Sequence, residues 1–432
     1  MRREARVGTT GSALSGQLQS AFGALVLLGL AWLASEDRSR VPWRIVLSAM
    51  ALALALCAAI NGLPWVRALL SVMDDAVLAL DAATGTATAM VFGYLGGAPS
   101  PYLEGGSGST FVLAFRALPI IVVMSALSAL LFHWRILPWV IRVFAALLTR
   151  VPGIGGVAGM SAAANVLVGM VEAPLFVRPY LAMLSRGELF MVMTGGMATV
   201  AGTVMVLYAS VLGPVLPDAL AHIVAASVIA TPVAIAVAAL MVPFAAPAPG
   251  EALPALVSSD ASAADAVTRG ALEGASLLIN IVALLLVFVA LATLANQLLA
   301  LLPTLGGTPV TLQRVLGIAF APVAWLVGVP WGEAPVAGAL LGTKTVLNEL
   351  LAYLQLAALP AGELSARSSL LMTYALCGFA NLGSAGILIG GLATLVPGRR
   401  AEIAALGMRS IVSGTLATCI TAALVGLFIA GP

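Results

Sequence analysis

Asn165-Val-Leu-Val-Gly-Met-Val-Glu-Ala-Pro-Leu-Phe-Val-Arg-Pro179 places polar and helix-disrupting residues inside a long apolar region. Its polar members are Asn165, Glu172 and Arg178, and its glycine and two prolines are badly tolerated in a straight helix. A second stretch, 325–353, is likewise apolar, interrupted and charged, and it repeats the tripeptide Glu-Ala-Pro. Two such segments in corresponding places of two halves are typical of a secondary transporter, whose site lies near the bilayer midplane between discontinuous helices.

The composition indicates a membrane protein. Hydrophobic residues make up 61% of the 432 residues and charged residues 9%, against roughly 25% charged in soluble domains. So few charges do not cover the surface of a soluble protein, and we therefore predict an all-α polytopic protein of the inner (plasma) membrane. The net charge of +2 argues against a nucleic-acid partner. The three cysteines lie singly in apolar segments and are expected to pack as small apolar side chains.

Eight apolar segments are long enough to cross a bilayer. They are 18–34, 46–63, 111–132, 188–212, 219–242, 275–302, 368–395, which is broken at 378–383, and 403–429. Arginines flank both ends of the first segment, so the positive-inside rule does not predict its orientation.

Other apolar segments do not have the pattern of simple spans. Residues 66–95 contain three aspartates, which predicts a surface segment followed by a buried one, and 134–150 is expected to lie in the membrane interface. Residues 153–179 and 315–353 are each predicted to form a re-entrant hairpin and an interrupted helix, because irregular backbone needs protein or a water-filled cavity around it. The polar stretch 243–273 is interpreted as the connection between two halves.

This pattern predicts an N-terminal scaffold of transmembrane helices and an interfacial segment, 1–110, followed by a core, 111–432. The core divides into two inverted-repeat halves, about 111–245 and 275–432.

Three motifs carry a resemblance to a known family. Gly169-x-x-Glu-Ala-Pro is similar to the family's Gly-Gln-Thr-Glu-Ala-Pro, and Gly378-Phe-Ala-Asn-Leu-Gly-Ser is close to its Gly-Phe-Ala-Asn-x-x-Ser. Gly342-Thr-Lys-Thr-Val-Leu-Asn-Glu-Leu-Leu-Ala-Tyr looks like its Gly-x-Lys-x-x-x-Asn-Glu-Phe-Val-Ala-Tyr, with two leucines as departures. From about residue 111 onwards the sequence thus resembles the concentrative nucleoside transporter family. The resemblance implies eight transmembrane helices, two re-entrant hairpins, interfacial helices and a homotrimer.

The resemblance also implies a substrate site. It implies that Glu349, Asn381 and Ser384 hold the ribose and that Glu172 lies on the base side. These groups suit a sugar diol, since a carboxylate accepts from two hydroxyls and an amide both donates and accepts. Met170, Val171, Val204 and Phe379 complete the substrate-binding set. Two alternatives stay open: the carboxylates pair structurally with Arg178 or Lys344, or Phe379 only packs in the core. Lys344 is interpreted as an internal counter-charge for a carboxylate.

A cation site is expected beside the first interrupted helix. Asn165 and Thr199 supply side-chain oxygens, and the resemblance adds the backbone carbonyls of Val168, Thr199 and Val200. This set favours Na⁺ as the coupling ion, whereas a proton carried by a titrating glutamate is the alternative. Asn165 has a second interpretation, as an interhelical hydrogen bond. No other cofactor is predicted.

Met170 and Val171 depart from the family, which carries Gln and Thr there and reads the nucleobase with them. The predicted function is therefore a cation-coupled symporter that imports nucleosides by alternating access, with atypical base selectivity. Two alternatives are a transporter of a nucleobase or modified nucleoside, and an intramembrane enzyme that uses its two carboxylates as an acid/base pair. His133 and His222 stand alone, either at helix ends or as proton relays.

Overall fold

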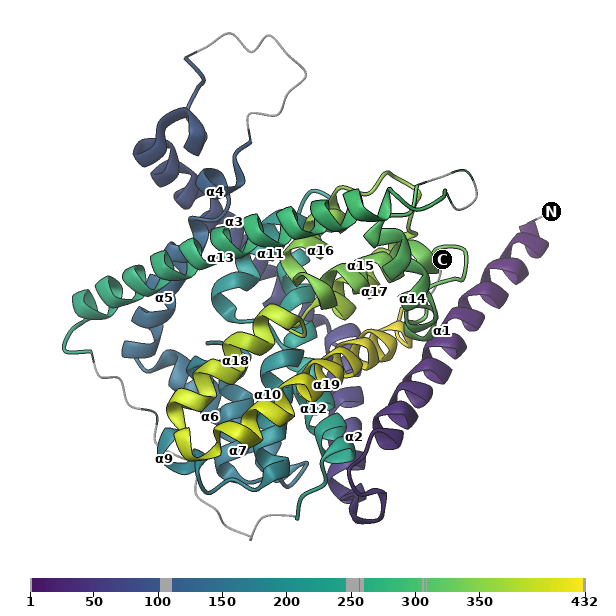
Figure 1. The fold of residues 1–432 in the computed structure, drawn as a ribbon, viewed down its shortest axis with the longest axis horizontal. Helices are drawn as coiled ribbons and strands as arrows, with labels where there is room; N and C mark the ends of the chain where they lie inside the picture. The colour runs from purple at the N-terminus through teal and green to yellow at the C-terminus, as the bar shows by residue number, and fades with distance from the viewer. Residues whose placement is uncertain are drawn as a thin grey trace.

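The computed structural model describes residues 2–101, 111–245, 256, 260–304, 307 and 309–429. Every regular element within these ranges is helical, as predicted (Figure 1). The predicted loop at 96–109 and the connection at 243–273 fall partly outside the described residues.

Three long helices form the N-terminal part: α1 (Arg2–Leu33), α2 (Trp43–Gly62) and α3 (Pro64–Phe92), with short 3-10 turns at Arg38–Arg40 and Gly93–Gly96. The first two confirm the predicted spans. Residues 66–95 are predicted to form a surface segment followed by a buried one; α3 joins both parts in one continuous helix from Pro64, and the segment able to cross a membrane begins at Asp75. Alanine and leucine, both strong helix formers, dominate its sequence, and these residues carry the helix past its aspartates.

The following helices form two series along the chain, one before and one after residues 242–262. The first is α4 (Leu113–Arg116), α5 (Ile120–His133), α6 (Ile136–Arg150), α7 (Gly156–Asn165), α8 (Glu172–Leu175), α9 (Arg178–Leu181), α10 (Arg186–Ala198), α11 (Gly202–Leu212) and α12 (Ala219–Met241). The second is α13 (Ala263–Leu299), α14 (Leu312–Val327), α15 (Ala334–Val346), α16 (Glu349–Ala357), α17 (Ala366–Leu376), α18 (Leu382–Leu395), a 3-10 turn at Pro397–Arg399, and α19 (Arg400–Gly426).

Each series contains a span that is broken in its middle. The break between α17 and α18 confirms the predicted interruption of 368–395. The predicted span at 188–212 is confirmed as Arg186–Leu212, but it contains a break that the sequence analysis does not predict, because α10 ends at Ala198 and α11 begins at Gly202. Backbone and hydroxyl groups at this break find partners elsewhere: the Thr199 hydroxyl donates to the Gly195 carbonyl at 2.9 Å, and the Gly202 amide donates to the Leu167 carbonyl at 3.2 Å.

Helices α5 and α13 pack side by side through small residues. A Cβ atom at Gly270 would lie 2.7 Å from the Ser125 carbonyl oxygen, and one at Gly274 would lie 2.8 Å from Cα of Val122. Only glycine permits this close approach, which is typical of helix pairs in membranes. The pairing leaves most of α13 on the outside of the protein, where it crosses the upper part of Figure 1.

Within the described residues, eight helical segments are long and apolar enough to cross a membrane. Seven match predicted spans; the eighth is Asp75–Gly96 of α3, whereas the broken span 368–395 gives only the shorter apolar helix α18. Burial differs sharply among them: 89% of the α12 window is buried but only 6% of the α13 window. Helix α12 is therefore central, and α13 is peripheral.

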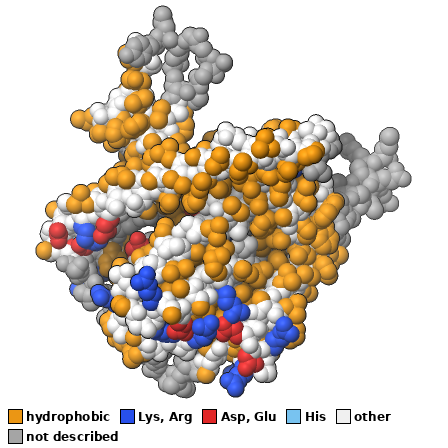
Figure 2. Space-filling model, viewed as in Figure 1, with side chains coloured by type: hydrophobic (Ala, Val, Ile, Leu, Met, Phe, Trp, Pro, Cys, Tyr) orange, Lys and Arg blue, Asp and Glu red, His pale blue; other side chains and the backbone are white. Residues whose placement is uncertain are grey.

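Charged side chains gather towards the lower part of an otherwise largely apolar surface (Figure 2). At the end where α1 stops and α10 and α19 start, Glu36 accepts from Arg186 at 2.9 Å and also from Arg409. Glu402 accepts from Arg399 at 2.8 Å on the same side. Arg186 lowers the pKa of the Glu36 carboxyl, chiefly by its hydrogen bond. This ionic network joins the turn between α1 and α2 to α10 of the first series and to α19 of the second.

Candidate functional site

Glu349 lies at the start of α16 and is almost fully buried, with 5% of its surface exposed. Asn348 precedes it as the N-cap, and its side chain accepts from the Leu351 amide at 2.8 Å. The Glu349 carboxylate accepts from the Tyr208 hydroxyl at 2.7 Å and from the Asn381 side-chain amide at 2.9 Å. Charge-assisted hydrogen bonds of this kind stabilise a carboxylate that has been removed from water.

Asn381 connects this carboxylate to the second broken span. It is the N-cap of α18, and its Oδ1 accepts from the Ser384 amide at 2.7 Å while its Nδ2 donates to Glu349. The structure therefore brings Glu349, Asn381 and Ser384 together, as the sequence predicts. Phe379, two residues before Asn381, is half-buried.

Glu172 is exposed, at the start of α8. It follows a tight segment in which Gly169 has a φ of 139°, a backbone conformation that strongly favours glycine. A Cβ atom there would also lie 2.5 Å from Oε2 of Glu172. Among the residues that the structure describes, neither Glu172 nor Glu349 forms an ion pair, so the alternative in which Arg178 or Lys344 neutralises them is not what the structure contains.

Lys344 is fully buried and forms no direct ion pair among the described residues, but its charge and that of Glu349 act on each other at longer range, so the predicted counter-charge role holds without direct contact. Its ammonium donates to the Ala375 carbonyl and to the Thr418 hydroxyl, both at 2.8 Å. The carbonyl is close to the C-terminal end of α17, where the helix dipole favours a cation. Lys344 thereby joins α15 to α17 and α19.

The repeated Glu-Ala-Pro tripeptide does not mark equivalent positions. Glu172 begins α8, whereas Glu333 precedes α15 and accepts from the Ser365 amide at 3.1 Å at the start of α17. Glu349, rather than Glu333, shares with Glu172 the position of first residue of a helix.

The predicted cation ligands lie where the segment after α7 meets the α10–α11 break. Asn165 is 1% exposed, and both its Oδ1 and its Nδ2 are buried without a hydrogen-bond partner. A Cβ atom at Gly196 would lie 3.4 Å from that Nδ2, which places Asn165 against the last turn of α10. Within the described ranges, no hydrogen bond is donated to the carbonyls of Val168, Thr199 or Val200. A buried amide and several unpaired carbonyls fit a hard cation, which prefers oxygen ligands.

The two departures from the family motif are packed against different helices. Met170 is buried against α10: a Cβ atom built at Gly196 would lie 2.9 Å from the Cβ of Met170. Val171 faces α18, where a Cβ atom at Gly391 would lie 3.0 Å from its Cγ1. Val204, in the first turn of α11, is also buried.

Sequence reasoning missed Tyr208 and Thr418. Tyr208 lies in an apolar helix, and a buried tyrosine hydroxyl usually has a hydrogen-bond partner, which was the available signal. His222 is not isolated either, because its Nδ1 lies 3.0 Å from the Tyr374 hydroxyl.

Three family models match the chain. Residues 22–95 match "Na+ dependent nucleoside transporter N-terminus", 114–215 match "Nucleoside recognition", and 222–426 match "Na+ dependent nucleoside transporter C-terminus". Together the matches extend over both series of helices and the N-terminal helices.

Named relatives agree with these matches. The chain is 34% identical to the nucleoside permease NupC of Helicobacter pylori, over 95% of this chain and 98% of that protein. It is 35% identical to sodium/nucleoside cotransporter 1 of Rattus norvegicus, over 76% of this chain and 53% of that protein. The inward-facing, substrate-bound structure of the transporter CNTnw, 36% identical, superposes with a TM-score of 0.86 over 95% of this chain and 97% of that chain.

Proposed function

Because the chain belongs to the concentrative nucleoside transporter family, we propose that it is a Na⁺-coupled symporter that imports nucleosides by alternating access. Members of this family are transporters, which sets aside the alternative of an intramembrane enzyme. Solved structures of CNTnw in inward-facing and outward-facing states, at TM-scores of 0.86 and 0.88 to this chain, support alternating access for the fold.

The ribose is held by Glu349, Asn381 and Ser384 in this proposal. The observation that carries it is the buried Glu349 carboxylate at the start of α16, linked to Asn381 at the start of α18. A carboxylate has about four lone-pair sites, and Tyr208 and Asn381 use two of them. Acceptor capacity is therefore left for the hydroxyls of a sugar, without loss of the bonds already present.

The base side is formed by Glu172, Met170 and Val171. Glu172 is an acceptor suited to an N–H group of a nucleobase, whereas Met170 and Val171 offer apolar contact only. An apolar wall discriminates among ligands by shape alone, worth roughly 1–3 kcal/mol. We therefore expect wider tolerance of bases than a wall with Gln and Thr would give. Val204 and Phe379 complete the substrate-binding set.

Na⁺ is assigned to the side-chain oxygens of Asn165 and Thr199 with the carbonyls of Val168, Thr199 and Val200. The unpaired, buried amide of Asn165 supports this assignment and weakens the alternative of an interhelical hydrogen bond. Binding of the ion would supply charge that satisfies these oxygens and would tie the segment that leads to Glu172 to the α10–α11 break.

The architecture that we infer has two inverted-repeat halves, about 111–245 and 275–432, behind a scaffold at 1–110. The broken span that each series contains, α10–α11 and α17–α18, supports this division, and we assign α7–α8 and α15–α16 as the re-entrant hairpins. Helix α13 has 37 residues, about 55 Å at 1.5 Å per residue, and its outward face is apolar. This face suits contact with a second copy, consistent with a homotrimer.

The orientation follows from the distribution of arginine. The end of the molecule at which α1 stops and α10 and α19 start is proposed to be cytoplasmic, by the positive-inside rule. Arginines of this end are Arg38, Arg40, Arg44, Arg178, Arg186, Arg399, Arg400 and Arg409.

The test is uptake of labelled nucleosides into proteoliposomes under separate Na⁺ and pH gradients. We expect uptake under the Na⁺ gradient alone. Uptake driven by the pH gradient alone, with no response to Na⁺, would refute the choice of Na⁺ and favour a titrating glutamate. Absence of uptake for every nucleoside, together with uptake of free bases, would refute the assignment of a ribose site.

A further inference from the structure

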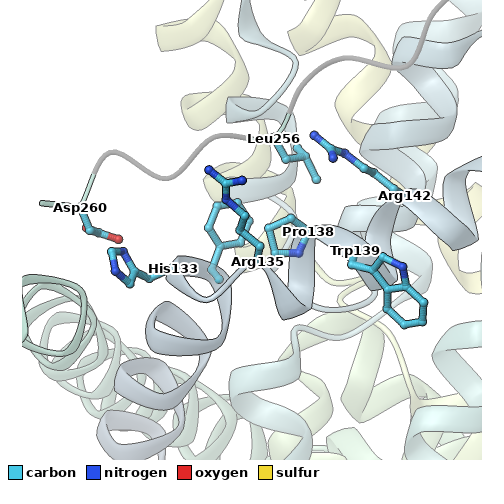
Figure 3. A pocket seen from close by; sticks show the side chains of 8 residues that line it. His133, Arg135, Pro138, Trp139, Arg142, Leu256 and Asp260 are labelled. Atoms are coloured by element: carbon cyan, nitrogen blue, oxygen red, sulfur yellow. The ribbon is translucent and has the colours of Figure 1, made fainter. Parts of the chain in front are cut away.

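A cavity at the elbow between α5 and α6 lies apart from the transport site. Its volume is about 510 Å³, and its polar lining consists of His133, Arg135, Arg142 and Asp260, with Trp139 as its exposed aromatic wall (Figure 3). In Figure 3 the side chains of His133 and Asp260 point towards one another, and the Arg135 and Arg142 guanidinium groups extend from the elbow and from α6.

The charge balance of this cavity favours an anion. Asp260 is already neutralised, because its carboxylate accepts from Arg269 at 2.6 and 2.9 Å. Within the described part of the chain, Arg135 and Arg142 have no carboxylate at ion-pair distance, and the Nδ1 of His133 is buried without a hydrogen-bond partner. Two unneutralised guanidinium groups and one unpaired imidazole nitrogen thus face the same space.

Helix α6 combines these charges with an apolar surface. Trp139 and Arg142 are three residues apart and share one face of the helix, and Arg135 is the residue that immediately precedes its first turn. Apolar side chains are exposed beside them: Trp134 (56%), Ile136 (46%), Trp139 (66%), Val140 (37%) and Val143 (54%). The opposite face is buried through Pro138, Ile141, Ala145 and Leu148. A helix with tryptophan and arginine beside an apolar surface is typical of the membrane interface, where both anchor at headgroup level.

We propose that this cavity binds the phosphate headgroup of an anionic phospholipid. Basic pockets between membrane helices recognise such headgroups, and the exposed apolar side chains of α6 offer a surface for the acyl chains that a soluble phosphate would not need. The binding site comprises Arg135, Arg142 and the imidazole of His133, with Trp139 at the level of the glycerol. The lipid is thus the committed occupant, and a free phosphate ester is the competing one.

Binding at this place acts on a hinge. Arg135 has a φ of 63°, a left-handed conformation that is unusual for arginine, and it is the residue that connects α5 to α6. Helix α6 leads directly into α7, which carries Asn165. A headgroup held by Arg135 and Arg142 together stabilises this turn, so lipid occupancy fixes the position of α6 relative to α5.

The experiment compares lipid retention by the purified full-length protein. Wild type, the pocket variant Arg135→Asn with Arg142→Gln, and the control variant Arg150→Gln with Arg400→Gln are incubated with vesicles of phosphatidylglycerol or phosphatidylcholine with identical chains. Asn is chosen at 135 because it tolerates positive φ. The control removes the same number of charges from exposed sites outside the cavity. Bound lipid is counted by native mass spectrometry.

Wild type and control should retain phosphatidylglycerol in preference to phosphatidylcholine. The pocket variant should lose about twenty-five-fold in phosphatidylglycerol affinity, since each of the two arginines near an anionic lipid strengthens binding about fivefold. The variant Arg142→Lys keeps the charge and should retain most of the lipid binding. Retention by this variant shows that loss of lipid binding on substitution at position 142 follows from loss of the charge and not from misfolding. Equal retention by all proteins, or equal binding of the two lipids, would overturn the proposal. If millimolar glycerol phosphate displaces the lipid, the ligand of this cavity is a soluble phosphate ester, and the assignment to a phospholipid is overturned.

Discussion

The change Glu349→Gln tests the sugar site most directly. Glu349 is 5% exposed and receives two hydrogen bonds, from Tyr208 at 2.7 Å and from Asn381 at 2.9 Å. Glutamine has the same shape, and its carbonyl oxygen accepts from Asn381 while its NH₂ group donates to the Tyr208 oxygen. The variant keeps a hydrogen bond to each neighbour but leaves the hydroxyl hydrogen of the buried Tyr208 without its acceptor. It should therefore fold with a loss in stability of about 1–3 kcal/mol, the cost of one unsatisfied buried donor.

The loss in affinity follows from the hydrogen bonds that a ribose would form. A hydrogen bond to a charged group contributes about 1.5–3 kcal/mol, so replacement of the carboxylate should weaken nucleoside binding by about ten- to a hundredfold. The assay is nucleoside affinity of purified protein by calorimetry, and initial uptake rates in proteoliposomes. Glu333→Gln is the matched control: Glu333 is also a glutamate beside a helix start, but its partner is Ser365.

Sugar analogues make the test specific to the ribose. Removal of the 2′- or 3′-hydroxyl should weaken binding to wild type by a similar amount, whereas the same analogues should bind the Glu349→Gln variant almost as well as the parent nucleoside. Such non-additivity is expected only for two groups in direct contact. If the folded variant binds nucleosides as tightly as wild type, or if the deoxy penalty is undiminished, Glu349 does not hold the ribose.

Three further changes test other parts of the proposal. Met170→Gln with Val171→Thr replaces the side chains beside Gly196 and Gly391 by polar ones of similar shape, and it should narrow the range of bases that the protein accepts. The measurement is the ratio of the affinities for uridine and adenosine, and an unchanged ratio would argue against contact of these residues with the base. Asn165→Ala should raise the Na⁺ concentration for half-maximal uptake by about tenfold or more, as the loss of a contact to a charged group implies; unchanged Na⁺ dependence would argue against coordination. Glu36→Gln should weaken the ionic network. Arg186 lowers the pKa of the Glu36 carboxyl below its ordinary value of 4.5. The charged carboxylate therefore stabilises the wild-type protein above this pH, and this stabilisation is lost as the pH falls through the lowered pKa. Melting temperatures against pH should therefore fall less steeply in acid for the variant than for wild type, and parallel curves would contradict this.

Most of the fold could be predicted from apolar length alone. Seven of the eight helical segments able to cross a membrane coincide with segments found in the sequence. The break at 199–201 could not be found in the same way, because it contains no proline and no charge. Its cause lies in tertiary structure: the Gly202 amide bonds to the Leu167 carbonyl, which is distant in sequence. The continuity of α3 is not evident from its charge pattern, because its aspartates interrupt the apolar sequence without breaking a helix rich in alanine and leucine.

The site was predictable where residues belong to contiguous motifs. Glu349, Asn381 and Ser384 were found because each lies in a motif beside a helix start, and the structure brings them together. Tyr208 and Thr418 contact Glu349 and Lys344 from other helices, and no local pattern marks them. The direct partners of Lys344 could not be predicted for the same reason, because they are a carbonyl and a hydroxyl that only tertiary packing supplies.

The two polar centres differ in a way that suggests an order of binding. Glu349 is satisfied by Tyr208 and Asn381 before any ligand arrives, so a sugar adds hydrogen bonds to a carboxylate that is already held in place. Asn165, in contrast, is buried with both amide atoms unpaired, a state that costs about 1–3 kcal/mol for each unsatisfied group. An ion that recruits Asn165 relieves this cost and orders the segment that leads to Glu172. The ion should therefore raise the affinity for the nucleoside, and by reciprocity the nucleoside should raise the affinity for the ion by the same factor. On the proposed assignment, coupling would arise from the unpaired amide of Asn165, and the sugar bound at the preorganised Glu349 carboxylate would gain affinity.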